Sequence, residues 1–472
     1  MNSSHASNAD HLARELTRRE ILGRCGIGFG SLALSAMQDG LGLHLPHHRP
    51  RAKNIIFLFM GGGPSQIDLF DHKPKLTELD GQVVPASFFN DARFAFLNTS
   101  QAKLLASPRR FAPMGPSGLN CSELLPHIGS IGDRICVLRG MKTEVINHGP
   151  AKLFMNTGAR VSGRPSIGSW VLYGLGSENR NLPGFVVMLS GARGPNGGGV
   201  HWDSGFLSAR YQGVPFRSGP DPILDLNNPP GIDRARQEDF FETLNKLNTL
   251  KLKEHYSDSL RARIESYELA SRMQLSAIDL TDLSGESDST LAMYGVKPGE
   301  SSFGMNCLIA RRLVERGVRF IQLYHTDWDH HGRPQLNLGK PLGDICREVD
   351  RPSAALVRDL EQRGLLEDTV VVWGGEFGRT PMRQEQIAEG RDHHIDAFTM
   401  WLAGGGIRPG LEFGKTDEIG YSVVENEVHV HDLHATLLHL LGIDHERFTY
   451  RFQGRDFRLT DIAGRVVSEI IA

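Results

Sequence analysis

One stretch constrains the fold of this chain more than any other: Phe320 to His331, with the sequence FIQLYHTDWDHH. An apolar run of this kind predicts a buried strand. The run ends in two carboxylates and three imidazoles, which are side chains that hold metal ions in proteins. The stretch therefore predicts an inner strand of a sheet with a metal site at its carboxyl end.

The segments around this strand predict a parallel sheet. One helical pattern covers Ser301 to Gly317, another covers about Leu342 to Arg363, and a second apolar run covers Thr369 to Gly375. A strand, a helix and a second strand imply a right-handed crossover and parallel pairing. In such sheets ligands bind beyond the carboxyl ends of the strands, and the second run delivers Glu376 and Arg379 at that edge.

Length and charge narrow the class of protein. The 472 residues suffice for one large α/β core with insertions. The net charge is −3 and no block of Lys and Arg stands out, so nucleic-acid binding is disfavoured. After the N-terminal region, no segment reaches the roughly 18 apolar residues of a membrane span. Many of the 20 histidines fall in short clusters near acids, which favours a metal.

The N-terminal region has the layout of an export signal. Arg18 and Arg19 form a twin arginine in TRREIL, and a small, apolar stretch follows from Cys25 to Met37. This order predicts a twin-arginine signal over residues 1–45, a translocase as export partner, and a periplasmic or secreted product. The alternative is a chance pair of arginines in an unstructured tail.

A glycine-rich turn follows the first predicted strand, Asn54 to Met60. The turn, GGGPSQIDLFD, has Gln66 where the dinucleotide pattern GxGxxG needs a glycine, which argues against a nicotinamide oxidoreductase. It places Asp68 or Asp71 beyond the end of the strand, near the same sheet edge as the other acids. For Asp71, capping of a helix or turn is an equal alternative.

Two pairs of adjacent histidines leave a choice open. His393 and His394 precede a further strand-like run, and His330 and His331 end the opening stretch. Neighbouring residues in a strand point to opposite faces, so at most one of each pair meets a given metal. The histidines of the helical tail from His431 to Asp444 are interpreted as surface or packing residues.

The stretch from about 234 to 285 is charged and helical in pattern, and no proline interrupts it. It predicts a peripheral helical insertion in a domain that covers residues 46–472.

Four segments resemble the signature segments of a bacterial family called domain of unknown function 1501, which consists of sulfatase-like proteins with twin-arginine signals. The segments are GGGPSQIDLFDHKP, TDWDHHG, LEDTVVVWGGEFGRTP and GRDHH. The resemblance extends over nearly all of the mature chain. It implies an α/β fold like that of alkaline phosphatases and sulfatases, with a mostly parallel sheet, helices on both faces, and one or two divalent ions at one sheet edge.

The resemblance also implies roles for individual residues. Asp68 takes the place of the acidic ligand after the first strand. Asp329 and His331 take the place of the acid and imidazole after the middle strand, and His393 that of the imidazole before the penultimate strand. Glu376 stands where relatives place an aspartate and is therefore predicted as a metal ligand. Because the residue differs, one of the two metal positions is altered or empty.

The segment HGPAKLFMNTG is similar to one in which relatives carry a nucleophile nine residues before a threonine. Counting back from Thr157 leads to His148, where catalytic relatives have serine, threonine or a cysteine converted to formylglycine. Histidine cannot carry out formylglycine chemistry, but it can form a phosphoryl intermediate or bind a metal.

These residues together predict a metal-dependent hydrolase of a sulfate or phosphate ester. The ion neutralises the oxyanion, Arg379 or Arg391 contacts the nonbridging oxygens, and His148 acts as nucleophile or general acid/base. Two imidazoles favour Zn or Mn over Ca or Mg. The alternative is a degenerate, noncatalytic member that binds anionic polysaccharide at the cell envelope.

Overall fold

The computed structural model describes residues 46–472, except for 90–93, 191–193, 218–230, 255–256 and 385–386. The predicted export signal at residues 1–45, with Arg18 and Arg19, lies outside the described residues. Within the described residues, every helix is too short or too polar to cross a membrane.

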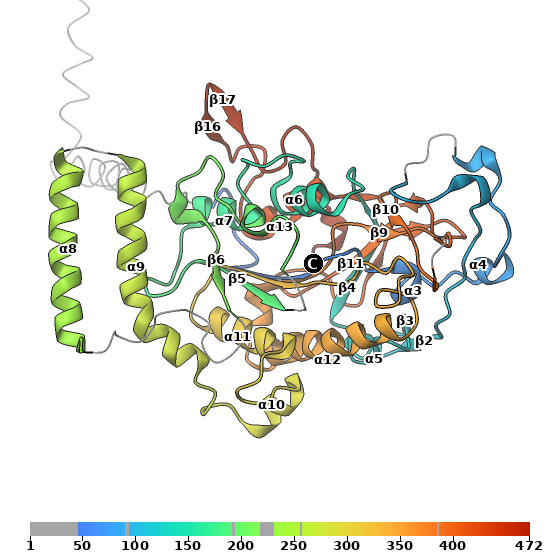
Figure 1. Cartoon of the computed structure of the whole chain (residues 1–472), viewed down its shortest axis with the longest axis horizontal. Helices are drawn as coiled ribbons and strands as arrows, with labels where there is room; N and C mark the ends of the chain where they lie inside the picture. Colours follow the sequence, from blue (N-terminus) through green and yellow to red (C-terminus); the bar gives the residue numbers. More distant parts are fainter. Residues whose placement is uncertain (1–45, 90–93, 191–193, 218–230, 255–256, 385–386) are drawn as a thin grey trace, which may run out of the picture.

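A nine-stranded sheet forms the centre of the molecule (Figure 1). Its strands follow the order β12-β4-β11-β8-β1-β7-β5-β6, and β15 also pairs with β4. The strands of this sheet are β1 (Asn54–Met60), β4 (Ile135–Lys142), β5 (Phe185–Ser190), β6 (Val214–Phe216), β7 (Phe320–His325), β8 (Thr369–Gly374), β11 (Phe398–Ala403), β12 (Glu412–Phe413) and β15 (Val428–His429).

The pairing confirms the predicted mostly parallel α/β sheet. The first strand, β1, lies between β7 and β8 and runs parallel to both, with Ile55 opposite Phe320 and Asn54 opposite Thr369. Strand β11 is antiparallel to both of its neighbours, β4 and β8. Because β1, β7 and β8 are parallel and adjacent, their carboxyl ends meet at one edge.

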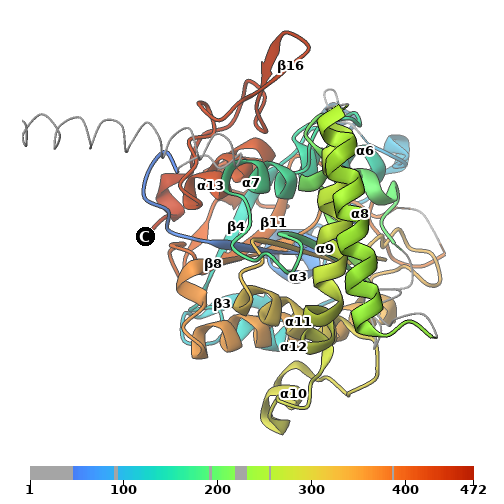
Figure 2. The ribbon, with the colours of Figure 1, turned by 90° about the vertical axis from the view of Figure 1, so that its left-hand side faces the viewer.

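Helices cover both faces of the sheet (Figure 1). The described helices of seven or more residues are α6 (His148–Thr157), α7 (Ile167–Leu175), α8 (Arg234–Glu254), α9 (Asp258–Thr281), α10 (Asp288–Tyr294), α11 (Phe303–Glu315), α12 (Lys340–Gln362) and α13 (Val430–Leu440). Shorter ones are α3 (Gln66–Leu69), α4 (Pro74–Glu78) and α5 (Pro126–Gly129). Helices α8 and α9 lie side by side at one end of the molecule, where the sequence predicts a helical insertion (Figure 2).

Alternation along β1 shows how the two layers form. Ile56, Leu58 and Met60 pack into the core shared with α11 and α12. Ile55, Phe57 and Phe59 belong to the core shared with α7 and α13. Successive side chains of a strand point to opposite faces, so an entirely apolar strand indicates burial on both sides.

Local signals fix the helix that precedes β7. Helix α11 begins after Ser302, whose Oγ accepts a hydrogen bond from the Met305 N–H at 3.0 Å. After its end, Gly317 adopts a φ of 77°, which turns the chain toward β7. The helix therefore begins and ends within two residues of the predicted range, Ser301 to Gly317.

Four two-stranded sheets complete the described fold. They pair β2 (Phe111–Met114) with β3 (Leu119–Ser122), β9 (Gly378–Arg379) with β10 (His393–His394), β13 (Lys415–Thr416) with β14 (Val423–Glu425), and β16 (Tyr450–Phe452) with β17 (Arg455–Phe457). The β9–β10 pair places His393 opposite Arg379, at the edge where β1, β7 and β8 end.

Candidate metal centre

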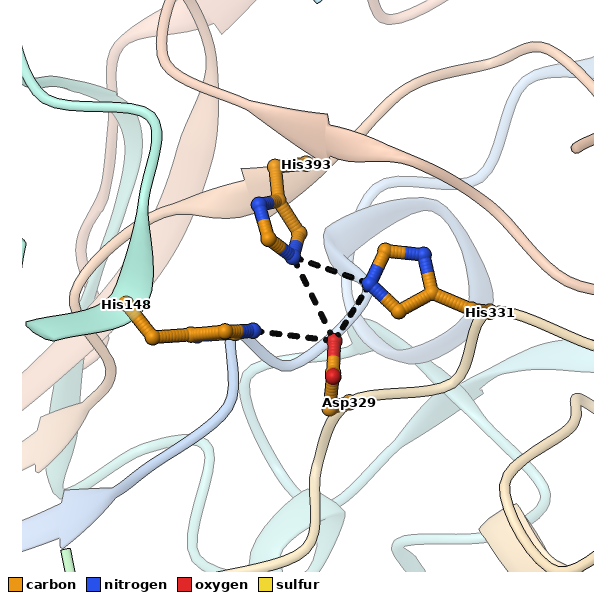
Figure 3. A group of neighbouring side chains, drawn as sticks. All are labelled: His148, Asp329, His331 and His393. Atoms are coloured by element: carbon orange, nitrogen blue, oxygen red, sulfur yellow. Dashed lines mark hydrogen bonds and ion pairs between the residues drawn. The ribbon is translucent and has the colours of Figure 1, made fainter. Parts of the chain in front are cut away.

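Three parts of the chain meet at this edge. The loop after β7 carries Asp329 and His331, and β10 carries His393. His148 is the first residue of α6, six residues after the end of β4. The four side chains point toward one another (Figure 3).

A glycine allows two of these loops to approach closely. Gly62, in the turn after β1, has a φ of 123°, which L side chains rarely adopt. A Cβ atom at this position would lie 2.8 Å from the backbone nitrogens of Trp328 and Asp329. The missing side chain at Gly62 thus lets the turn pack against the backbone of Asp329.

The candidate metal centre consists of His148, Asp329, His331 and His393, whose potential ligand atoms all lie within 4.8 Å of one another. The Oδ1 atom of Asp329 is 3.0 Å from Nε2 of His148, 2.7 Å from Nε2 of His331 and 3.4 Å from Nε2 of His393 (Figure 3). Three imidazole nitrogens and one carboxylate oxygen therefore converge on one point.

Each imidazole is oriented through its other nitrogen. Nδ1 of His148 lies 2.7 Å from Oε1 of Glu376. Nδ1 of His393 lies 2.7 Å from the carbonyl oxygen of Ile146, and Nδ1 of His331 contacts Oε1 of Gln384. Acceptors at all three Nδ1 atoms favour a proton there, which leaves each Nε2 of a neutral ring with its lone pair directed inward.

This arrangement fits a bound cation. The Nε2 atoms of His331 and His393 are 2.9 Å apart, a distance at which two lone pairs repel. The Nε2 atom of His148 is buried and has no hydrogen-bond partner among the described residues, since its contact with Asp329 lacks hydrogen-bond geometry. Nitrogen ligands with a carboxylate oxygen are a donor set that zinc accepts.

The charges around the centre keep Asp329 ionised. Burial alone raises the pKa of its carboxyl, but Arg379, whose Nη2 is 2.6 Å from Oδ1, and the three imidazoles lower it well below the usual range. Burial, together with the positive charge of Arg379, lowers the pKa of His393 to about 4. The carboxylate and the neutral imidazole are the forms that bind a metal.

His148 lies among the candidate ligands, which is one of the roles that the sequence left open beside nucleophile and general acid/base. Its imidazole lies between the carboxylates of Asp329 and Glu376. Burial lowers its pKa, and the two carboxylates together raise it to a larger extent, so that the pKa lies above its usual value. Neither nitrogen of this ring is directed at open space.

Glu376, predicted as a metal ligand, lies outside the group and contacts it through His148. Its side chain is fully buried and also accepts the Gly62 N–H at 3.0 Å. Burial raises the pKa of this carboxyl, but Lys152, with Nζ 3.8 Å from Oε1, and His148 outweigh burial and lower the pKa to about 2. Glu376 therefore orients His148 rather than contacting the same point as Asp329.

Asp68, also predicted as a metal ligand, is not brought to the group. It forms a fully buried ion pair with Arg391, with distances of 2.8 Å from Nε to Oδ2 and 3.2 Å from Nη2 to Oδ1. Ser65 Oγ donates to the same carboxylate. Burial raises the pKa of Asp68, but Arg391 and Ser65 outweigh burial, so the pKa lies below its usual value. The carboxylate is therefore ionised, and Arg391 balances its charge.

The two arginines predicted to contact substrate are both fully buried. Arg379 donates to the backbone oxygens of Gly62, Gly63 and Arg391 in addition to Asp329. Arg391 donates to the carbonyl of Leu105 in addition to Asp68. Their guanidinium groups hold the loops of the site together, and they are committed to protein partners.

The structure places one member of each histidine pair in the group. Nδ1 of His330 faces the Trp328 carbonyl at 2.9 Å, and His394 contacts the Tyr421 carbonyl instead. Burial lowers the pKa of His330 to about 4. In the tail, His431 and His434 are buried against the carbonyls of Gly158 and Met155, as expected for packing residues.

Sequence reasoning missed the groups that orient the ligands. Gln384 and the Ile146 carbonyl hold His331 and His393. A backbone carbonyl leaves no signal in a sequence, and Gln384 belongs to no recognisable spacing. Only the tertiary contacts bring them to the site.

The comparisons with solved structures find distant similarities. The PsFucS1 sulfatase from Pseudoalteromonas sp. has 12% sequence identity and a TM-score of 0.37, with 84% of this chain and 69% of that chain covered. The phosphonate monoester hydrolase SpPMH from Silicibacter pomeroyi has 11% sequence identity and a TM-score of 0.35, with 89% of this chain and 76% of that chain covered. The alkaline phosphatase from the Antarctic bacterium TAB5 has 11% sequence identity and a TM-score of 0.29, with 83% of this chain and 98% of that chain covered. At these TM-scores the similarities carry no conclusion about function.

No curated protein sequence matches the chain significantly. One family profile matches residues 52–471, which is nearly all of the described chain, and its description is protein of unknown function (DUF1501). The match agrees with the resemblance of the four signature segments, and the chain belongs to the DUF1501 family.

Proposed function

We propose that the chain is a metal-dependent hydrolase of sulfate or phosphate esters. The observation that carries the proposal is the convergence of three imidazole Nε2 atoms and one carboxylate oxygen within 4.8 Å. The group is also partly accessible to solvent: 29% of the Asp329 side chain and 15% of the His148 side chain is exposed. A site that only stabilised the fold would be closed on all sides, whereas a catalytic site keeps an open position.

The donor set supports Zn or Mn over Ca or Mg. Calcium and magnesium prefer oxygen ligands, whereas this group offers three nitrogens. Within the described residues it is the one group of this kind, which supports one ion rather than two. A divalent ion bound there would neutralise charge on a sulfate or phosphate group and lower the pKa of a bound water.

Other residues orient the candidate ligands and set their charge. Glu376, Gln384 and the Ile146 carbonyl fix the three rings, so that little reorganisation is needed when a ligand binds. Arg379 holds Asp329 ionised. Nδ1 of His148 contacts Glu376 and its Nε2 would bind the metal, which favours water as the nucleophile.

The test is metal removal and reconstitution. Folded protein is stripped with a chelator, reloaded separately with Zn, Mn, Mg or Ca, and assayed with 4-nitrophenyl sulfate and 4-nitrophenyl phosphate. We expect Zn or Mn to restore hydrolysis, and Asp329→Ala and His331→Ala to abolish both metal binding and hydrolysis. His330→Ala is the matched control, since this neighbouring buried histidine lies outside the group. Equal hydrolysis by stripped and reloaded protein would refute the proposal.

The second candidate is a noncatalytic protein that binds anionic polysaccharide. The chemistry of the group favours it, because the four side chains include no hydroxyl or thiol, and Nε2 of His148 is itself a candidate metal ligand. Protein that binds a stoichiometric metal, hydrolyses neither ester and is retained on a sulfated glycan column would support this candidate instead.

We also propose export to the periplasm or beyond, on the twin arginine and the apolar stretch that follows it. Arg18→Lys with Arg19→Lys should leave the protein in the cytoplasm when expressed in a bacterium with a twin-arginine translocase. Unchanged fractionation of the double variant would contradict export by this route.

A further inference from the structure

A pocket of about 260 Å³ borders the candidate metal centre on the side of His331. Phe96, Arg333 and Arg383 line it together with His331 and Gln384, whose Oε1 contacts the same imidazole. The pocket and the metal centre thus share one ring. None of the described residues that line the pocket is acidic.

Phe96 is an exposed aromatic residue that is held in place. The residue is 64% exposed. Its ring nevertheless lies edge-on to the rings of His331 and His393, with centroid distances of 5.4 and 5.7 Å. Its backbone is anchored by Asp392, a fully buried carboxylate. Oδ2 of Asp392 accepts the N–H groups of Ala95, Phe96 and Leu97 at 3.1, 2.8 and 2.8 Å.

This anchoring distinguishes Phe96 from a chance surface residue. Three hydrogen bonds to one carboxylate fix the segment more firmly than neutral contacts do. The same Asp392 is bonded through Oδ1 to the backbone N–H of His393. The segment that presents the aromatic ring and the strand that presents a candidate ligand are therefore tied to a single side chain.

The two pocket arginines are available to a ligand, in contrast to Arg379 and Arg391. Arg383 is 41% exposed and pairs with Glu389, itself 43% exposed, at 3.0 Å, a surface contact of low strength. Arg333 is exposed, and no ion pair joins it to an acidic side chain among the described residues. The pocket consequently combines an aromatic face with two exposed positive charges, one of them weakly paired.

We propose that this pocket binds the group attached to the scissile sulfate or phosphate, and that it selects a single ring bearing a second anionic substituent. The inference rests on the proposed hydrolase function, because it places the ester at the metal centre. Phe96 packs on the face of the ring, and Arg333 and Arg383 bind the second anion. The volume is below the range of about 300–1,000 Å³ common for ligand pockets, which suits one ring rather than a long chain.

The test uses three phosphonates, because their carbon–phosphorus bond survives during a binding measurement. Methylphosphonate has no ring, phenylphosphonate has a ring, and 4-carboxyphenylphosphonate adds a second anion. Isothermal titration with zinc-loaded protein gives the affinity for each. We expect each addition to tighten binding by about fivefold or more. A C-linked glucosyl phosphonate, measured in parallel, distinguishes a sugar ring from an aromatic ring.

Variants assign these gains to residues. Phe96→Ala should lose the gain from the ring and keep its metal and its affinity for methylphosphonate. Arg333→Gln with Arg383→Gln should lose only the gain from the second anion. The matched control is Phe240→Ala, because Phe240 is 65% exposed on α8, outside the pocket.

The outcomes separate this inference from the proposed function. If wild-type protein binds metal and methylphosphonate but gains nothing from the ring, or if Phe96→Ala keeps the gain, the pocket inference is overturned and the hydrolase proposal stands. If wild-type protein binds neither zinc nor methylphosphonate, the proposed function fails and the inference fails with it.

Discussion

Replacing Glu376 with glutamine tests whether the buried carboxylate orients a metal ligand. Oε1 of Glu376 lies 2.7 Å from Nδ1 of His148, so the carboxylate fixes the ring and raises the basicity of Nε2. Glutamine keeps the shape of the side chain and removes its charge. Its amide can still accept the Nδ1 proton, so the geometry of the ring should persist while its basicity falls.

The expected loss follows from this contact. Mutating the group that hydrogen-bonds a ligating histidine lowers metal affinity by about 10- to 100-fold, which corresponds to about 1.4–2.7 kcal/mol. The burial of Glu376 favours the upper part of this range, since water does not reach the site to replace the carboxylate. The change also leaves Lys152 without its nearest carboxylate, so the variant should be less stable.

The assay is competition for zinc between the protein and a chromophoric chelator at pH 7.5. Denaturant unfolding of the metal-free proteins is measured separately, so that the affinity is compared only where both proteins are folded. The control is Glu348→Gln, which alters a similar contact: Oε2 of Glu348 lies 3.0 Å from Nε2 of His325, away from the candidate metal centre. Equal zinc affinities for Glu376→Gln and wild type would refute the assigned role of Glu376.

Three further changes should act through the loops and the buried charges. Gly62→Ala should lower stability by about 1–3 kcal/mol and weaken metal binding in a zinc titration, because the added Cβ meets the Asp329 backbone. Gly81→Ala is the control: Gly81 also has a positive φ but faces open space, so this change should cost less and leave metal binding unchanged. Arg379→Leu should cost about 3 kcal/mol or more in urea unfolding, because it leaves Asp329 without its cation; an unchanged midpoint would contradict this. Burial raises the pKa of Asp350 to about 6 from 3.8, although two backbone N–H bonds oppose it, so this carboxyl stabilises the fold below pH 4 and the contribution is lost as the pH rises through 6. Relative to wild type, Asp350→Asn should therefore gain about 2–3 kcal/mol between pH 4 and pH 7, and a constant difference across this range would contradict the assignment.

The order of elements was predictable from the sequence because apolar runs and helical patterns are local. Asn54–Met60 and Thr369–Gly374 are strands with nearly the predicted bounds, and the sheet is mostly parallel as expected. Asp329 and His331 could be placed at the site because they follow a strand, and the family resemblance placed His393 with them. The antiparallel direction of β11 could not be read, because apolar content alone does not give direction.

The contacts between loops could not be predicted to the same extent. Asp68 and Glu376 both follow strands that end at the site edge, yet one pairs with Arg391 and the other with His148. A carboxylate at such an edge can meet a metal, an arginine or an imidazole, and the choice depends on side-chain positions a few ångströms apart. The role of Phe96 had no sequence signal, since its position depends on the distant Asp392.

The most direct test of the account is the metal content of the folded protein, measured by elemental analysis after desalting, for wild type and His393→Ala. His394→Ala is the control, because His394 is equally buried but contacts the Tyr421 carbonyl rather than the metal centre. The account predicts about one divalent ion per wild-type and His394→Ala chain, and a large loss in His393→Ala. Wild-type protein that holds no ion after incubation with Zn or Mn, or His393→Ala that holds as much as wild type, would contradict a metal centre formed by these four side chains.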